Sequence, residues 1–314
     1  VGSVEPPSVD LAVFSVVMEG EHFIRVWPTE GECPIVLSAP HGGRLRPQEL
    51  PDRTSGCVEH DAWSMELAIE IRKAFIQLSG CGAVPALVAM CLDRTKIDAN
   101  RNMCNSGPEP VWASWARYHG AIEAALEACV DKFGFALLID VHGQSHRSAA
   151  ELGYLLQWRD LLCSDRDLDA RPRKSSLNSL PCRKENESSL SEVIRGSRSF
   201  GAALERCGFP CTPSPGQPRP VVPGVEHVRP NALGIGSDTF FSGGYTTRRY
   251  GAPDTIPQFS NPLPSSGWSR NVAVVQLEPE MRVREDPQLR EKFAAAVRFA
   301  ALHLLNLSDR RAEL

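Results

Sequence analysis

The chain has 314 residues, which is enough for one large α/β domain or two small ones with a sizeable buried core. Its net charge of −4 lacks the basic excess with which proteins hold nucleic acid, so small or neutral partners are favoured. Hydrophobic residues make up 42% of the chain, yet no run approaches the roughly 20 consecutive apolar residues that span a bilayer. We therefore expect a soluble protein, secreted or cytoplasmic, with no nucleic-acid or membrane partner.

The ten cysteines are scattered and form no Cys-x-x-Cys pair. This spacing argues against a thiolate zinc site or a dithiol redox centre. The cysteines fit either disulfides or buried thiols.

Apolar runs that end at turn signals alternate with stretches of helical periodicity. The runs predict strands within 33–40, 84–93, 135–143, 152–158 and 272–280. The periodic stretches predict helices within 60–80, 108–134 and 286–308. This alternation is typical of an α/β fold with a largely parallel sheet and crossover helices.

The texture changes to Ser, Pro, Arg and Gly over about 160–225, and we interpret this part as loops. The strand predicted at 272–280 then rejoins the same sheet. The chain 1–314 is therefore predicted to be a single domain with a long Ser/Pro-rich insertion.

Polar side chains follow three of the predicted strands, where ligands of open α/β sheets bind. His41 follows the first strand, His142 lies at the end of the third, and Glu278 ends the last. A hydrolytic zinc site uses three His or carboxylate ligands, and the two histidines would supply two of them. The third is expected from the segment "VEHDAW", where we favour Asp61 over Glu59.

Each of these residues also has a plain structural interpretation. A single histidine after a strand is usually a hydrogen-bonded core or surface residue. Asp61 could serve only as an acid at a helix N-terminus, worth about 0.3–1 kcal/mol. Asp140, two residues before His142 on the same strand face, would either orient that imidazole or pair with a neighbouring Arg.

Two further segments offer groups for a substrate. In "DRTKIDANRN", Arg101 presents a fork of donors to a carboxylate or oxyanion, or else forms a salt bridge to Asp93 or Asp98. The segment "FFSGGYTTRRYG", at 240–251, is expected to be too glycine-rich for a helix. It would form either a mobile flap over the substrate or a hairpin with a solvated tip.

Six stretches in this order, "SAPHGG", "VEHDAWSMELA", "DRTKIDANRN", "IDVHGQ", "SGGYTTRRYG" and "VVQLEPEMR", resemble the N-formylglutamate amidohydrolase family. This family is related to zinc carboxypeptidases and aspartoacylases. The resemblance runs from about residue 35 to 285 and so covers most of the chain.

The resemblance implies a three-layer α/β/α fold of the phosphorylase/hydrolase type, with a mixed sheet and one Zn²⁺ per chain at its carboxyl edge. His41, His142 and an acid of the "EHD" segment would hold the metal. Glu278 would be the general base, and Asn100 with Arg101 would bind a substrate carboxylate. Tyr245 and Arg248 are transferred to the substrate site on weaker grounds.

One departure concerns the metal ligands, because relatives with His-x-x-Glu carry an acid where this chain has Arg44. The acidic ligand must therefore come from elsewhere. We expect the glycines after His41 to leave space for metal and substrate at the strand end.

Together these features predict a zinc-dependent hydrolase that cleaves an amide bond in an N-acyl or N-formyl amino acid or small peptide bearing a carboxylate. Mn, Co or Ni could occupy the same ligands. One alternative is a carboxypeptidase-like metallopeptidase acting on longer chains. Another is a metal-free binding protein or pseudoenzyme on the same fold, which stoichiometric zinc would argue against.

Overall fold

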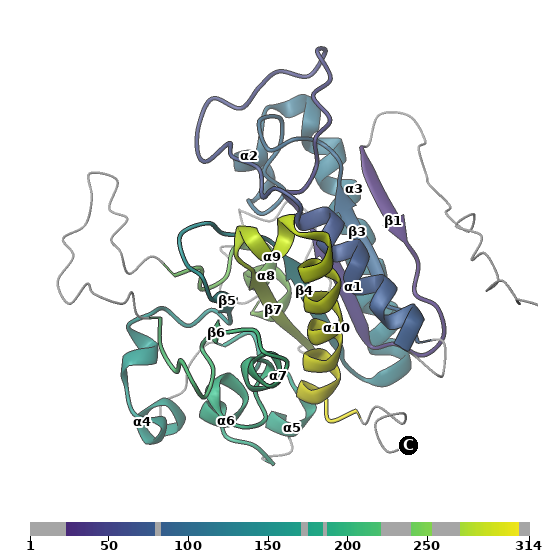
Figure 1. Ribbon diagram of the computed structural model, residues 1–314. Helices are drawn as coiled ribbons and strands as arrows, with labels where there is room; N and C mark the ends of the chain where they lie inside the picture. Colours follow the sequence, from purple (N-terminus) through teal and green to yellow (C-terminus); the bar gives the residue numbers. More distant parts are fainter. Residues whose placement is uncertain are drawn as a thin grey trace, which may run out of the picture.

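The computed structural model describes residues 23–78, 83–170, 175–184, 187–220, 240–252 and 271–307, and a mixed sheet runs through its centre (Figure 1). The seven strands follow the order β1-β3-β2-β4-β7-β5-β6. Their bounds are Ile24–Trp27 (β1), Ile35–Ala39 (β2), Ala86–Met90 (β3), Ala136–Val141 (β4), Ala150–Gly153 (β5), Cys211–Thr212 (β6) and Val272–Glu278 (β7). Strands β3, β2, β4 and β7 are parallel to one another, whereas β1 and β5 pair antiparallel with β3 and β7.

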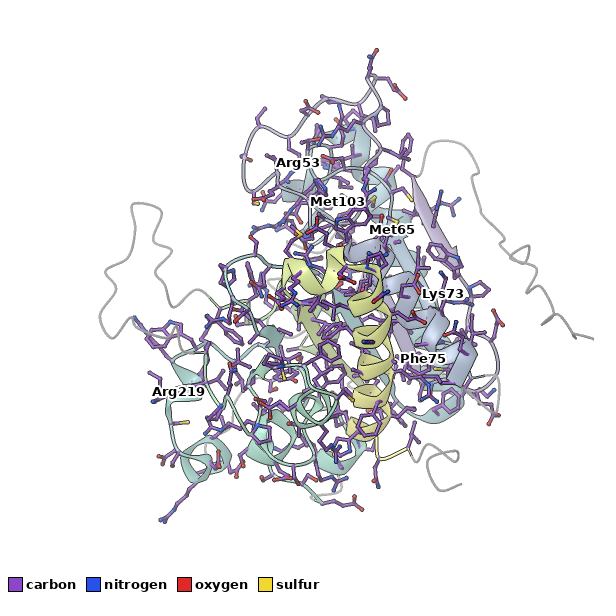
Figure 2. All side chains as sticks on the ribbon, in the orientation of Figure 1. Arg53, Met65, Lys73, Phe75, Met103 and Arg219 are labelled. Atoms are coloured by element: carbon purple, nitrogen blue, oxygen red, sulfur yellow. The ribbon has the colours of Figure 1, made fainter. Side chains whose placement is uncertain are left out.

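Helices cover both faces of the sheet. Their bounds are Ser64–Leu78 (α1), Met103–Ser106 (α2), Trp112–Phe133 (α3), Asp165–Ala170 (α4), Pro181–Lys184 (α5), Leu190–Arg195 (α6), Phe200–Arg206 (α7), Tyr245–Gly251 (α8), Met281–Glu285 (α9) and Pro287–Leu304 (α10). Helices α1 and α10 pack side by side on one face, where Phe75 is buried between them and the sheet (Figures 1 and 2). Helices α3 and α8 cover the other face.

Burial on both faces explains why the central strands are apolar throughout rather than alternating. In β2, Ile35 and Leu37 belong to the core under α1 and α10, while Val36 belongs to the core under α3. The predicted three-layer α/β/α fold with a mixed, largely parallel sheet is therefore confirmed.

The sheet register brings the ends of the parallel strands to one edge. Ser38 of β2 pairs with Asp140 of β4, and Val141 of β4 pairs with Leu277 of β7. The residues that follow β2, β4 and β7 therefore meet at the same place.

The prediction of loops over 160–225 is wrong for much of the described part, which holds four short α-helices, a 3-10 helix at Asp160–Leu162 and the strand β6. Several serines there cap helices instead of opening loops. Ser189 accepts a hydrogen bond from the amide of Glu192, and Ser199 does the same for Ala202. Apolar side chains such as Phe200 then bury each short helix against the core.

The segment 240–251 also differs from its prediction, because its second half is helix α8 rather than a flap or a hairpin. Tertiary contacts stabilise this short helix despite its glycines. The buried Arg249 pairs with Glu123 of α3, and the Tyr250 hydroxyl contacts His119. Long-range partners thus outweigh the local propensity.

The strand predicted at 152–158 lies earlier, at 150–153, and Leu155 has a positive φ of 65° that ends it. The nine described cysteines are all free thiols. Within the residues that the structure covers, no helix combines the length and apolar character needed to cross a bilayer.

Candidate metal centre

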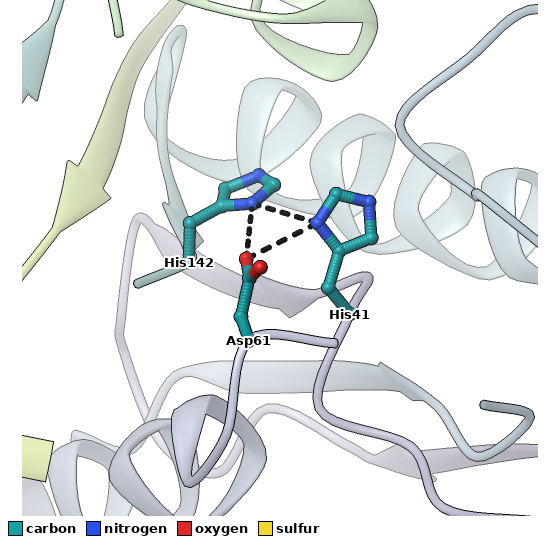
Figure 3. Close-up of side chains that lie close together, drawn as sticks. All are labelled: His41, Asp61 and His142. Carbon is teal, nitrogen blue, oxygen red and sulfur yellow. Dashed lines mark hydrogen bonds and ion pairs between the residues drawn. The ribbon is translucent and has the colours of Figure 1, made fainter. Parts of the chain in front are cut away.

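Two imidazoles and a carboxylate converge at the carboxyl edge of the sheet (Figure 3). His41 lies two residues after β2, His142 directly follows β4, and Asp61 lies just before α1. The two Nδ1 atoms are 3.1 Å apart. Asp61 Oδ2 is 3.1 Å from Nδ1 of His41 and 3.0 Å from Nδ1 of His142. Both histidines are 2% exposed, so these atoms face each other in a buried site.

The opposite nitrogen of each ring contacts a further buried carboxylate. Nε2 of His41 lies 2.7 Å from Oδ1 of Asp98, and Nε2 of His142 lies 3.0 Å from Oδ2 of Asp140. Asp140 in turn accepts a hydrogen bond of 2.6 Å from the Ser38 hydroxyl. A carboxylate that accepts a hydrogen bond from Nε2–H keeps the ring proton on Nε2 and so leaves Nδ1 with its lone pair.

This arrangement directs three electron-pair donors at one point. Two Nδ1 lone pairs and a carboxylate oxygen repel one another unless a positive charge lies between them or one ring carries a second proton. Burial disfavours the imidazolium of His142, but the carboxylates of Asp140 and Glu278 outweigh this effect and raise its pKa. The site therefore favours a positive charge, and a divalent cation is the ligand that two imidazoles and a carboxylate fit.

Asp61 is the acid that joins the histidines, whereas Glu59 is exposed to solvent. The backbone amide of Asp61 donates to the carbonyl of His41, and Oδ1 of Asp61 lies 3.3 Å from Nη1 of Arg94. Burial works against the charged carboxylate, but the neighbouring His41 and His142 hold the pKa of Asp61 well below its usual range. Asp61 is therefore ionised, as a metal ligand must be.

Arg94 contacts two carboxylates of the centre at once, and it is not among the site residues predicted from the sequence. Its guanidinium bonds Oδ2 of Asp98 at 3.0 Å while it also reaches Asp61. Because Asp98 contacts His41, one guanidinium connects a ligand carboxylate with the carboxylate that orients a ligand imidazole. The only signal in the sequence was the charge pattern of "DRTKID", which lies in a turn without periodicity.

Glu278, the last residue of β7, is buried beside the two histidines. Its Oε1 lies 4.0 Å from Nδ1 of His142 and accepts a 2.9 Å hydrogen bond from Nε2 of Gln276. Burial raises the pKa of Glu278 to about 8, and the like charges of Asp61 and Glu151 add to this effect while His142 opposes it. A carboxylate with this pKa exchanges protons near neutral pH.

A cavity of about 280 Å³ opens over the histidines, and we call it the inner cavity. All four residues predicted to bind substrate line it: Arg101 and Arg248 are exposed, Asn100 is partly exposed and Tyr245 is buried. Arg101 lies 3.6 Å from Asp98 but its side chain is 54% exposed. The predicted salt bridge to Asp98 is therefore present, and the guanidinium still reaches the cavity.

Asn100 also lines this cavity, but protein groups occupy its amide. Its Oδ1 accepts a hydrogen bond from the backbone amide of Thr246, and its Nδ2 lies 3.2 Å from Nε2 of His142. Because Nδ2 of Asn100 is a donor, the acceptor for the proton on Nε2 is the carboxylate of Asp140, and we assign the hydrogen bond from Nε2–H to Asp140. Asn100 thus connects the start of α8 to the metal centre.

The glycines near the histidines serve close packing, and the expectation that they leave space for metal and substrate is wrong. A Cβ on Gly42 would overlap the backbone of Met65 at the start of α1, and a Cβ on Gly43 would overlap the carbonyls of Cys91 and Leu92, which directly follow β3. Similarly, a Cβ on Gly143 would overlap the guanidinium of the buried Arg284. These glycines hold the loops against their neighbours and so position the histidines.

Comparisons with known proteins give similarity only among solved structures, because no family model and no curated protein sequence matches the chain. One similar structure is a gene product of Agrobacterium tumefaciens, with a TM-score of 0.48, 11% identity, and coverage of 90% of this chain and 95% of the other. Another is an N-formylglutamate amidohydrolase from Ralstonia eutropha JMP134, with a TM-score of 0.46, 14% identity, and coverage of 93% and 99%. A third, from Burkholderia mallei ATCC 23344, is provisionally named a carboxypeptidase; it has a TM-score of 0.37, 11% identity, and coverage of 91% and 60%.

Proposed function

We propose that the chain is a metal-dependent hydrolase that cleaves the amide bond of an N-acyl amino acid or small peptide. The observation that carries this proposal is the convergence of Nδ1 of His41, Nδ1 of His142 and Oδ2 of Asp61, all within 4.8 Å of one another. Two imidazoles and one carboxylate are the ligand types of hydrolytic Zn²⁺ sites. Such sites keep a fourth coordination position open, whereas many structural zinc sites are closed by thiolates.

His41, Asp61 and His142 would hold one Zn²⁺ per chain. Such a cation would supply Lewis-acid chemistry, lowering the pKa of the attacking water and polarising the substrate carbonyl. The buried carboxylates of Asp98 and Asp140 support the assignment, because metal-binding histidines typically donate their second N–H to such a group.

Glu278 would act as the general base and acid. Its carboxylate takes a proton from the attacking water, whose oxygen bonds to the acyl carbon. The C–N bond then breaks, and Glu278 returns the proton to the nitrogen of the leaving amine. The raised pKa of Glu278, about 8, supports both halves of this role.

Arg101 would bind the carboxylate of the substrate, and Arg248 and Tyr245 would contribute from the same wall. The exposure of the Arg101 side chain to the inner cavity supports this assignment. A guanidinium offers a planar pair of donors that matches a carboxylate.

The test combines metal analysis with acid release from N-acyl amino acids. We expect about one zinc per chain by elemental analysis, and release of formate or acetate from N-formyl- or N-acetyl-glutamate that chelation stops and zinc restores. The variant Asp61→Asn, which keeps the shape but weakens a ligand, is expected to lose metal and activity together. A purified chain that neither retains zinc nor hydrolyses any N-acyl amino acid would contradict the proposal.

A further inference from the structure

A second, larger cavity adjoins the inner cavity and shares one wall with it. This outer cavity measures about 710 Å³, compared with about 280 Å³ for the inner one. Arg101, Tyr245 and Arg248 line both cavities, so they lie at the junction between them. The volume of the inner cavity lies near the lower end of the range for small-molecule sites, roughly 300 Å³. An N-acyl amino acid is a small ligand and therefore needs only this inner cavity.

The junction carries positive charge that protein groups neutralise only in part. Arg101 reaches a single carboxylate, Asp98, at 3.6 Å, and that carboxylate already bonds His41 and Arg94. Arg248 is exposed, and it forms no ion pair with another of the described residues. Two guanidiniums at the border of two cavities are therefore suited to an anionic group in the middle of a ligand, not at its end.

The wall of the outer cavity is polar. Hydroxyl and amide side chains line it, from Thr54, Ser55, Asn102 and Asn105. The guanidinium of Arg53 (labelled in Figure 2) donates to the carbonyls of nearby loop residues and braces this wall. Such a surface matches the amides of a peptide backbone and disfavours a long apolar chain.

We propose that the substrate is an N-acylated acidic peptide whose first side-chain carboxylate lies between Arg101 and Arg248 and whose following residues lie in the outer cavity. This inference rests on the proposed function, because the acylated nitrogen then faces the metal centre. The small acyl group stays in the inner cavity, and the leaving peptide extends through the junction.

Binding of the leaving peptide tests the inference without any need for turnover. Titration calorimetry on the zinc-loaded protein would compare glutamate, Glu-Gly-Ser and Gln-Gly-Ser. We expect Glu-Gly-Ser to bind at least tenfold more tightly than glutamate, and Gln-Gly-Ser to bind at least tenfold more weakly than Glu-Gly-Ser. The variant Ser55→Trp, which fills the outer cavity, should remove the advantage of the tripeptide over glutamate.

Two further variants keep this test decisive. Asn105→Trp fills the same cavity from another element and should have the same effect as Ser55→Trp. If one of the two variants misfolds, the other still provides the test. Gln77→Trp places the same side chain on the exposed face of α1 and should leave the tripeptide advantage intact. Equal affinity for glutamate and Glu-Gly-Ser, or an advantage that survives both blocking variants, would overturn the inference.

The proposed function fails separately. If the tripeptide binds in the expected pattern but acetyl-Glu-Gly-Ser and acetyl-glutamate release no acetate, the outer site stands and the hydrolase does not. If both substrates are cleaved at equal kcat/KM and both products bind equally, the hydrolase stands and the outer site does not.

Discussion

Replacing Asp140 by Asn tests how the metal centre sets the proton of its histidine. Asp140 is fully buried, and its two oxygens have different partners: the Ser38 hydroxyl donates to Oδ1, and Nε2 of His142 lies 3.0 Å from Oδ2. An Asn that keeps the bond to Ser38 would present an NH₂ group to Nε2. The ring would then move its proton to Nδ1, the nitrogen that faces His41 and Asp61.

The size of the effect follows from these contacts. A proton on Nδ1 must be displaced before this nitrogen can bind a cation. Loss of such an outer partner typically costs 10–100-fold in metal affinity, or about 1.4–2.7 kcal/mol. We expect Asp140→Asn to fall in this range, because the bond is short, buried and charged.

Zinc affinity is measured by competition with a chromophoric chelator. Asp131→Asn removes one negative charge from an exposed position on α3 and is the matched control, expected to stay within twofold of wild type. A thermal melt checks that both variants fold. If folded Asp140→Asn binds zinc as tightly as the control, Asp140 does not set the tautomer and the reasoning fails.

Further outcomes follow from the site and its packing. Glu278→Gln should lower kcat by about 10²–10⁴-fold with zinc stoichiometry unchanged, and loss of zinc would instead make Glu278 a ligand. Since Glu278 must be ionised to accept a proton and burial raises its pKa, kcat/KM should rise with pH as this carboxyl group ionises. Glu151→Gln removes a like charge and should move that rise to lower pH; an unchanged or higher midpoint would contradict the electrostatic argument. Gly43→Ala should destabilise the fold by about 1–3 kcal/mol in denaturant titration because its Cβ would overlap Cys91, whereas Gly120→Ala, with open space on α3, should stabilise it by about 0.5–1 kcal/mol.

The sequence predicts the parts of the site that depend on parallel strands. Continuous apolar runs identify β2, β4 and β7, and such strands end at one edge, so His41, His142 and Glu278 had to lie close together. Asp61 follows from its position before an amphipathic helix and from the chemistry of zinc ligands.

The remaining features depend on contacts that no local pattern encodes. Asp98 reaches His41, and Arg94 reaches Asp61, only because an irregular turn after β3 folds back over the sheet edge. Helix α8 likewise exists through Arg249 and its partner Glu123, which is 126 positions away in the chain. Periodicity describes one element at a time and therefore cannot predict such pairs.

The three donor atoms of the metal centre come from the residues that follow β2 and β4 and from the segment before α1, and the two histidines are 101 positions apart. An unfolded chain cannot offer these donors together, so a bound cation would act as a removable crosslink between two strands and a helix. Its free energy of binding would then add to the free energy of folding, by RT ln(1 + [M]/Kd). Supply or withdrawal of the cation in the surroundings would consequently set the lifetime of the protein as well as its activity.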